Sequence, residues 1–493
     1  MNFRVIAKIL SFIALIMALS MGACAVFALV VANDPDARPV EHSAVGALGI
    51  STLISFVVFL ALFLSGLGSR NEVLRREAIV IVGLSWFQAA ILGLFPYVLC
   101  DPGLDIIPAY FESASGITTT GSSVMNDIES FPLAVLLWRS VSQFLGGIGI
   151  LVVFVSILSF IGAGSRSLMT QESSLNLTDS GAARVKDAAS LLLKVYLILT
   201  VACGLGMYAL GMPAFEAVCH AMTAVATGGF SPKNASLGHY DSVPIELWTA
   251  SFMFLGSISF LLYVFLLRRN WDRIRAEEEA RYYVVLLLCA IVAIALDLVL
   301  VEKKPFWYSL EKTFFNVVSL SSTTGFAAGD YDEWPLFSRM LLMAIMTVGG
   351  CAGSTAGGIK MNRIILFKRI AVRELSRSFR PHQVMRIKLN GLRPDEHVFV
   401  TTSFFIALAF AIGGMASVLV ALMQPELDFT STVGCVFATL FNIGPGFAEV
   451  GPTDNFGFLK PGTLLLLSFL MVLGRLEFFA VLVLLVPALW RKY

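Results

Sequence analysis

Long apolar segments constrain the fold of this chain more than any other feature of its sequence. Several of them reach the length of about 20 residues that an α-helix needs to cross the hydrocarbon core of a bilayer. Only 14% of the 493 residues are charged, whereas a soluble domain averages about 25%. The alternating apolar and polar pattern of an outer-membrane barrel is absent. We therefore predict an all-α polytopic membrane protein.

The spanning segments are interrupted by shorter apolar runs at regular intervals. Membrane spans are predicted at 3–31, 45–68, 78–100, 134–163, 188–212, 244–267, 282–302, 335–371, 397–424 and 460–490. Half-length runs lie at 106–118, 213–226, 306–322 and 429–441. Each half-length run ends on a turn that contains glycine. After two N-terminal helices, a unit of helix, pore helix, filter turn and helix thus recurs four times around one predicted pore.

This repeat predicts five parts. Residues 1–70 hold the two N-terminal transmembrane helices, and pore repeats one to four occupy 71–165, 166–270, 271–393 and 394–493. The third repeat also carries a glycine-rich stretch, the candidate gating loop, and a basic linker predicted to be cytoplasmic.

The distribution of charge predicts the orientation. With a cytoplasmic N-terminus, the basic clusters at 268–281 and 360–393 fall inside, as the positive-inside rule favours. All four glycine turns then lie on the outer side, and both termini are cytoplasmic. Many acids, including Glu112 and Glu246, fall outside. We expect these acids to form a vestibule that raises the local cation concentration.

The four turns have the composition of a cation filter. Backbone carbonyls from converging loops can replace the hydration shell of a monovalent cation, and glycine permits the dihedral angles that aim them at one axis. One Thr-Gly pair is typical of an ordinary helix C-cap, but four at repeating positions indicate a filter. The candidate residues are Thr119, Thr120, Gly121, Thr227, Gly228, Gly229, Thr323, Thr324, Gly325, Asn442, Ile443 and Gly444.

A glycine-rich stretch follows the third turn. Its glycines and small polar residues disfavour a straight helix. A nucleotide phosphate loop would need a Gly-Lys-Ser/Thr order that is missing. Close helix packing and a broken helix that gates the pore both remain open. The candidate gate residues are Gly349, Gly350, Gly353, Gly357 and Gly358, with Lys360 at the cytoplasmic edge.

Arg475 is predicted to lie halfway along the last spanning helix. A lone arginine at that depth costs at least a few kcal/mol, so it should face the pore or an ionic partner in another repeat. Arg139 and Lys194 lie near predicted helix ends and are interpreted as interfacial anchors. The scattered histidines predict no metal site.

The turns Thr-Thr-Thr-Gly-Ser, Ala-Thr-Gly-Gly-Phe-Ser, Ser-Thr-Thr-Gly-Phe and Asn-Ile-Gly-Pro-Gly-Phe resemble the pore loops of the Trk/Ktr/HKT superfamily of potassium transporters. The resemblance is strongest to the Trk membrane subunit, and it covers nearly the whole chain. It implies filter glycines at Gly121, Gly229, Gly325 and Gly444. It also implies that the glycine-rich stretch gates the pore and that Arg475 lies just below the filter as a barrier to cations. The fourth turn departs from the Thr-x-Gly pattern.

The resemblance also implies a setting and partners. It implies a homodimer in the bacterial inner membrane, with a cytosolic nucleotide-binding regulatory subunit of the TrkA type. The basic linker at 360–393 either holds anionic lipid headgroups or docks that regulator. The chain has no nucleotide-binding glycine motif of its own, and no cofactor is expected beside the transported potassium.

The predicted function is potassium uptake through the four-repeat filter, gated by an intramembrane loop and regulated in trans. The alternative is a proton- or sodium-coupled cation symporter with alternating access. Coupled transporters usually carry intramembrane carboxylates, and only Asp297 and Glu477 are candidates. The scarcity of such carboxylates favours a channel-like mechanism. An enzyme is not expected, because no cluster of histidine, aspartate and nucleophile lies at a common depth.

Overall fold

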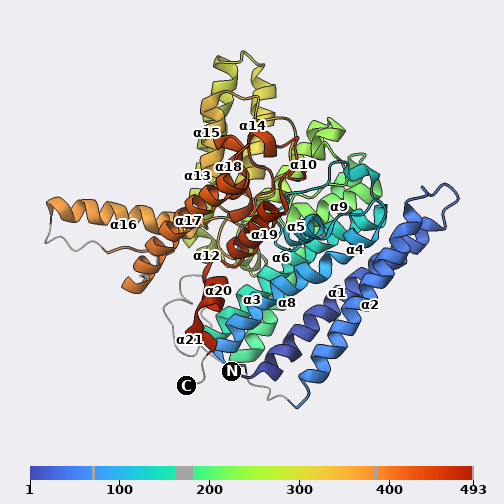
Figure 1. Cartoon of the computed structure of the whole chain (residues 1–493). Coiled ribbons are helices and arrows are strands. Elements are labelled where there is room, and N and C mark those ends of the chain that lie inside the picture. The colour runs from blue at the N-terminus through green and yellow to red at the C-terminus, as the bar shows by residue number, and fades with distance from the viewer. Residues whose placement is uncertain (69–72, 162–180, 381–385, 392–393, 491–493) are drawn as a thin grey trace.

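The computed structural model describes residues 1–68, 73–161, 181–380, 386–391 and 394–490. Within these ranges the protein is built from helices (Figure 1), with one isolated bridge between Val348 and Ile359. Seven of the described helices are long and apolar enough to cross a membrane, or nine if each of two bent pairs counts as one span. The expected repeat boundaries near residues 70, 165 and 393 lie outside the described residues.

The helices follow the predicted order closely. The first are α1 (Phe3–Ala32), α2 (Glu41–Ser65), α3 (Arg75–Gly93), α4 (Phe95–Leu99), α5 (Ile106–Ile117) and α6 (Leu133–Ile161). Next come α8 (Gly181–Ala209), α9 (Ala214–Val225), α10 (Val243–Ser257), α11 (Phe260–Leu267), α12 (Trp271–Ala276) and α13 (Glu279–Leu300). The remainder are α14 (Phe306–Ser321), α15 (Leu336–Met346), α16 (Met361–Phe379), α17 (Glu396–Met423), α18 (Phe429–Leu440), α19 (Pro461–Arg475), α20 (Phe479–Leu482) and α21 (Pro487–Trp490). Short 3-10 turns are η1 (Ile128–Ser130), η2 (Ser236–Tyr240), η3 (Ala448–Val450) and η4 (Val483–Leu485).

Helices α1 and α2 lie side by side along one flank, as the two extra N-terminal helices (Figure 1). The start of α1 meets α3 and α21 in a small apolar cluster that includes Ile6, Val80 and Leu489. The first and last described helices therefore reach the same end of the molecule.

The four short helices α5, α9, α14 and α18 pack in a cyclic order. Each contacts the helix before it and the helix after it, and also the helix that follows the preceding short helix in the cycle: α19 for α5, α6 for α9, α10 for α14 and α15 for α18. Pro213 and Pro305 precede α9 and α14 with φ of −54° and −57°, which presets the first turn. The C-terminal halves of all four short helices are buried. Their carboxyl ends therefore converge inside the molecule, where the negative ends of the helix dipoles favour a cation.

Two predicted spans are bent where continuous helices were expected. Helices α10 and α11 meet at 90°, and α19 meets the segment that starts with α20 at 114°. At the second bend, Glu477 and Phe478 adopt left-handed φ of 54° and 63°, which ordinary side chains avoid. Arg475 therefore ends a helix and does not lie in the middle of one.

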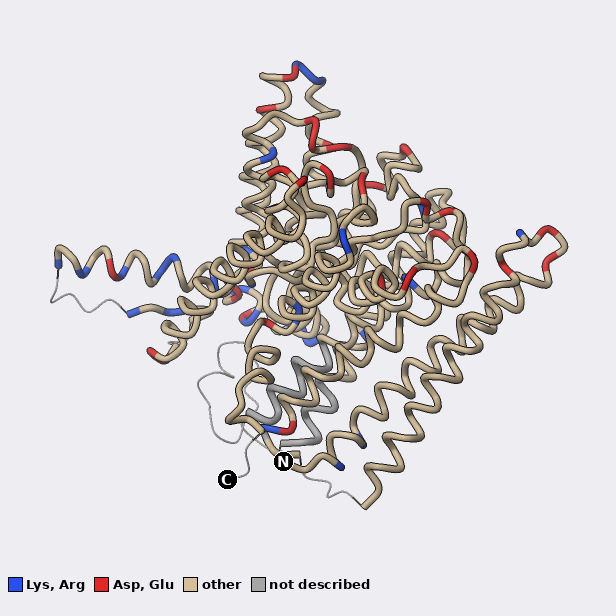
Figure 2. The backbone as a smooth tube through the Cα atoms, viewed as in Figure 1, with Lys and Arg blue, Asp and Glu red and all other residues tan. Residues whose placement is uncertain are grey.

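The predicted span 335–371 is also corrected. It consists of the apolar helix α15, a non-helical stretch at 347–360, and the amphipathic helix α16. Helix α16 extends away from the body of the protein (Figure 1). Figure 2 shows Lys and Arg along α16 and many acidic residues on the loops at the opposite margin. Residues 381–385 and 392–393 of the basic linker lie outside the described residues.

Candidate ion-conducting ring

The four predicted filter turns share one backbone conformation. In each, an amide at the second candidate position donates to a carbonyl five residues earlier. These bonds run from Thr120 to Ser115, Gly228 to Thr223, Thr324 to Ser319 and Ile443 to Ala438, at 2.8–2.9 Å. The same geometry thus ends α5, α9, α14 and α18 despite different sequences.

Two positions in every turn are left-handed. The first candidate residue has a φ of 52–55°, and the glycine two residues later has a φ of 76–107°. The pairs are Thr119 with Gly121, Thr227 with Gly229, Thr323 with Gly325, and Asn442 with Gly444. In the second turn Gly229 occupies the left-handed glycine position. Glycine accepts this conformation without the penalty that a Cβ atom brings.

The four turns close into a ring. An ideal Cβ built on Gly121 would stand 2.2 Å from the carbonyl oxygen of Gly228 in the second turn. The equivalent distances are 2.0 Å from Gly229 to Thr324, 2.0 Å from Gly325 to Ile443 and 2.9 Å from Gly444 to Thr120. Each glycine therefore abuts the carbonyl of the next turn, and the fourth returns to the first. A side chain at any of these glycines would displace a carbonyl of the ring.

Side chains brace the turns unequally. Asn442 donates its amide to Thr120 Oγ1 and to the Met471 carbonyl, both at 2.9 Å, and so links the fourth turn to the first. Thr323 Oγ1 accepts a 2.6 Å hydrogen bond from Gly357 N. Thr119 Oγ1 is buried and finds no hydrogen-bond partner among the described residues. Hydroxyl and carbonyl oxygens thus line a buried polar region within the helical core.

The non-helical stretch 347–360 lies against the innermost ends of the turns. Thr355 Oγ1 donates to the carbonyl of Val225, at 2.9 Å. A Cβ on Gly357 would stand 2.5 Å from the Phe441 carbonyl, and one on Gly349 would stand 2.0 Å from the Gly357 carbonyl. The stretch therefore touches the second, third and fourth turns and folds tightly on itself.

The other candidate gate residues pack in the same place. A Cβ on Gly350 would stand 2.4 Å from the Ser257 carbonyl at the bend between α10 and α11. The Gly353 carbonyl accepts from Phe260 N at 3.1 Å, and Gly358 has a φ of 65°. Lys360 is buried, and its Nζ donates to the Ala356 carbonyl within the stretch.

Arg475 reaches the stretch from the end of α19. Its Nη1 donates to the Thr355 carbonyl at 2.7 Å, and the residue is 3% exposed. Its Nε and Nη2 are buried and have no hydrogen-bond partner in the part of the chain that the structure describes. Glu477, two residues later, forms an ion pair with Arg363 at 2.6 Å. A guanidinium with unused donors therefore lies beside the candidate gate.

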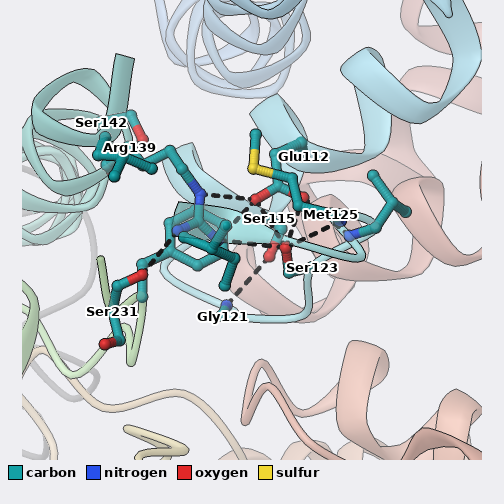
Figure 3. Close-up of polar contacts among 12 residues, drawn as sticks. Glu112, Ser115, Gly121, Ser123, Met125, Arg139, Ser142 and Ser231 are labelled. Atoms are coloured by element: carbon teal, nitrogen blue, oxygen red, sulfur yellow. Dashed lines mark hydrogen bonds and ion pairs between the residues drawn. The ribbon is translucent and has the colours of Figure 1, made fainter. Parts of the chain in front are cut away.

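Arg139 is buried next to the ring, so the interpretation as an interfacial anchor is wrong. It is 1% exposed and pairs with the fully buried Glu112 at 2.8 Å (Figure 3). Glu112 also accepts from Ser123 Oγ and from Val124 N, just after the first turn. Glu112 was expected in a solvent-exposed vestibule, but it neutralises this arginine inside the protein.

A second expected vestibule acid is also internal. Glu246 is 1% exposed and forms an ion pair with Lys312 of the third short helix at 2.7 Å. The sequence predicted that both acids lie in outer loops exposed to solvent. Each is instead buried because it forms an ion pair with a basic side chain of a neighbouring helix. The described residues include no group of three His, Cys, Asp or Glu side chains placed to hold a metal ion. The backbone carbonyls and hydroxyls of the turns are the candidate cation ligands.

Comparison with known proteins gives full-length matches. A family model described as TrkH, cation transport protein, matches residues 51–492. The chain is 34% identical over 505 residues to the Trk system potassium uptake protein TrkH of Salmonella typhimurium, covering 100% of both chains. It is 34% identical over 496 residues to the protein of that name from Halomonas elongata, again covering 100% of both. The crystal structure of the potassium transporter TrkH from Vibrio parahaemolyticus matches with a TM-score of 0.88, at 29% identity and 100% coverage of both chains. This structural match confirms the predicted all-α membrane fold.

Proposed function

The chain belongs to the TrkH family of cation transport proteins, a transport family and not a family of enzymes, and we propose that it takes up potassium across the bacterial inner membrane. The closed ring of carbonyls is the observation that carries the proposal, because four turns with one backbone geometry can surround a dehydrated cation. The names of the full-length relatives support potassium as the ion. In this proposal residues 71–165, 166–270, 271–393 and 394–493 are the four pore repeats.

The stretch 347–360 is the gate in this proposal. Its contacts with Val225, Thr323 and Phe441 join it to three of the four turns, at the carboxyl ends of the short helices. An ion that leaves the ring inward meets this stretch. Two hydrogen bonds between backbone and hydroxyl groups join it to the second and third turns, each contributing only about 1 kcal/mol. Opening the gate must also break or carry along the bonds that tie the stretch to Ser257, Glu279 and Arg475.

Arg475 is the electrostatic barrier in the same pathway. Two of its nitrogens have no hydrogen-bond partner among the described residues, so we infer that its positive charge acts on an ion under the ring. This charge lowers the occupancy of the space below the ring by potassium and is displaced when the gate moves, because the arginine is bonded to Thr355.

Helix α16 is the proposed contact for regulation. It carries basic residues beside exposed apolar ones such as Val372, Leu375 and Phe379, and it extends from the body (Figure 1). We place it on the cytoplasmic side with both termini, following the positive-inside rule. A cytosolic nucleotide-binding subunit that binds α16 would pull directly on the gate, since Met361 follows the gating stretch.

The homodimer is a further part of the proposal, and crosslinking of single-cysteine variants in membranes tests it.

Ion flux in proteoliposomes tests the transport proposal. The purified protein should pass potassium down its electrochemical gradient and prefer it to sodium. Gly121→Ser should reduce that preference, because a Cβ at this site would stand 2.2 Å from the Gly228 carbonyl. Gly211→Ser is the matched control, because Gly211 also has a positive φ of 100° but has no atom of the described residues within 4 Å of the Cβ position.

Two results would contradict the proposal. Potassium accumulation that follows an imposed proton gradient at zero voltage would favour the proton-coupled symporter. An unchanged potassium preference in Gly121→Ser would remove the ring from the selection of ions.

A further inference from the structure

Two side chains of α6, Gln143 and Arg139, form hydrogen bonds with the backbone of the second turn. Gln143 Nε2 donates to the Gly228 carbonyl at 2.6 Å, and its Oε1 accepts from Phe230 N at 3.1 Å. One helical turn earlier, Arg139 Nη1 donates to the Ser231 carbonyl at 2.9 Å (Figure 3), and its guanidinium lies 4.0 Å from the centroid of the Phe230 ring. Arg139 and Gln143 are 1% and 0% exposed. A helix of repeat one thus fixes three backbone atoms of the turn that belongs to repeat two.

The first and third turns are braced differently, by hydroxyl groups of their own. Thr118 and Thr120 share a hydrogen bond between their hydroxyls at 2.7 Å. Ser322 and Thr324 do the same, also at 2.7 Å. The equivalent positions of the second turn are Ala226 and Gly228. The second turn therefore lacks both hydroxyls of this internal pair.

Gln143 fills the place that the missing side chain leaves. A Cβ on Gly228 would stand 2.4 Å from both the Cδ and the Oε1 of Gln143. The amide of Gln143 and a threonine at position 228 therefore exclude each other. Because the amide both donates and accepts, it replaces the brace while keeping the buried backbone polar groups satisfied.

The second turn matters to the ring because the Gly228 carbonyl lies next to Gly121. A carbonyl oxygen has two lone pairs, so the bond from Gln143 fixes its direction and leaves one lone pair free for an ion. Arg139 is tied on its other side to Glu112 and Ser123, which flank the first turn. Movement of α6 would therefore shift the first and second turns together.

We propose that Gln143 is a positioning residue for ion selection, which sets the Gly228 carbonyl in place of the hydroxyl pair that braces the first and third turns. This inference rests on the proposed function, since it assumes that the ring selects the ion. It assigns part of the selectivity to a residue outside the filter turns and on the helix of another repeat.

Potassium and sodium flux into proteoliposomes containing the full-length protein tests the inference. Gln143→Ala should lower the preference for potassium over sodium by about tenfold, because it frees the Gly228 carbonyl and opens a gap behind it. Gln424→Ala is the matched control: Gln424 is also buried, at 2% exposed, and its Oε1 accepts from Lys460 N and Thr463 Oγ1, which belong to none of the four turns. The control should keep the wild-type preference.

A rescue variant distinguishes positioning from general destabilisation. Gln143→Ala combined with Ala226→Ser and Gly228→Thr rebuilds in the second turn the hydroxyl pair of the third. It should recover part of the lost preference. Gln143→Met keeps most of the side-chain volume without its hydrogen bonds, and it should also lose preference for potassium. It provides the test if the alanine variant does not fold.

The possible results have separate meanings. If Gln143→Ala and Gln143→Met both keep the wild-type preference, the inference is overturned. Equal loss in Gln143→Ala and Gln424→Ala, or a rescue variant no better than Gln143→Ala, also overturns it. A wild-type protein that passes cations without preferring potassium would instead overturn the proposed function.

Discussion

Replacing Gly325 by alanine tests the ring at one of its two tightest points. An ideal Cβ on Gly325 would stand 2.0 Å from the Ile443 carbonyl and 2.6 Å from Pro445 Cδ, whereas real Cβ atoms essentially never come closer than 3.0 Å. The two turns must therefore separate by at least 1.0 Å, the difference between these distances. Neither neighbour is the end of a flexible side chain, so the backbone has to move. We expect the preference for potassium over sodium to fall by at least tenfold, which corresponds to about 1.4 kcal/mol.

Backbone strain must be separated from this displacement. Gly325 has a φ of 81°, and an alanine there costs about 1–2 kcal/mol for its left-handed conformation alone. Gly211 has a φ of 100°, but no atom of the described ranges lies within 4 Å of its Cβ position. Gly211→Ala should therefore lose similar thermal stability and keep its ion preference, measured by flux of each ion into proteoliposomes. If Gly325→Ala keeps the wild-type preference, or if both variants lose it alike, the reasoning about the ring is refuted.

Three further predictions concern charged groups. Arg475→Gln should raise potassium flux several-fold under the same gradient, because it removes the charge beside the gate; an unchanged tracer flux would contradict the barrier. Glu112→Ala should destabilise the protein by about 3–5 kcal/mol, because it leaves Arg139 buried and unpaired, whereas the exposed Glu426→Ala should not shift the melting temperature. Burial raises the pKa of Asp332, in the loop between α14 and α15, to about 6 from 3.8. Its protonated form is thus favoured in the folded state, and the stability that this carboxyl contributes is fully present below pH 3.8 and lost as pH rises through about 6. Asp332→Asn should show a smaller loss of thermal stability over that interval, and a loss equal to that of the wild type would contradict the role of burial.

The elements that sequence predicted well have local signals. A half-length apolar run followed by a glycine turn marks α5, α9, α14 and α18, and the predicted runs end within a residue or so of these helices. The bend at 476–478 has no such signal, because Leu476, Glu477 and Phe478 are compatible with a continuous helix. Contacts with residues far away in the sequence hold this unusual conformation. Glu477 forms an ion pair with Arg363, and the ring of Phe478 packs on that of Phe405 with 4.9 Å between the ring centroids.

The buried polar residues were missed for a related reason. Arg139 and Glu112 are 27 residues apart, and only the packing of α5 on α6 brings them together. Gln143 could have been noticed as an amide in an apolar segment, but its target lies 85 residues away in another repeat. A pairing of this length depends on how whole repeats dock.

The sequence by itself determined the membrane fold, the four turns and the glycines within them, because hydrophobic length and left-handed backbone positions are properties of short segments. The tertiary structure decided the order of the ring, the bends of two spans, and which charges are buried. Those features depend on contacts between segments far apart in the sequence, where a carbonyl of one turn meets the glycine of another and α6 supports the turn that follows α9. Local chemistry therefore specified the four turns, and long-range packing specified how they meet.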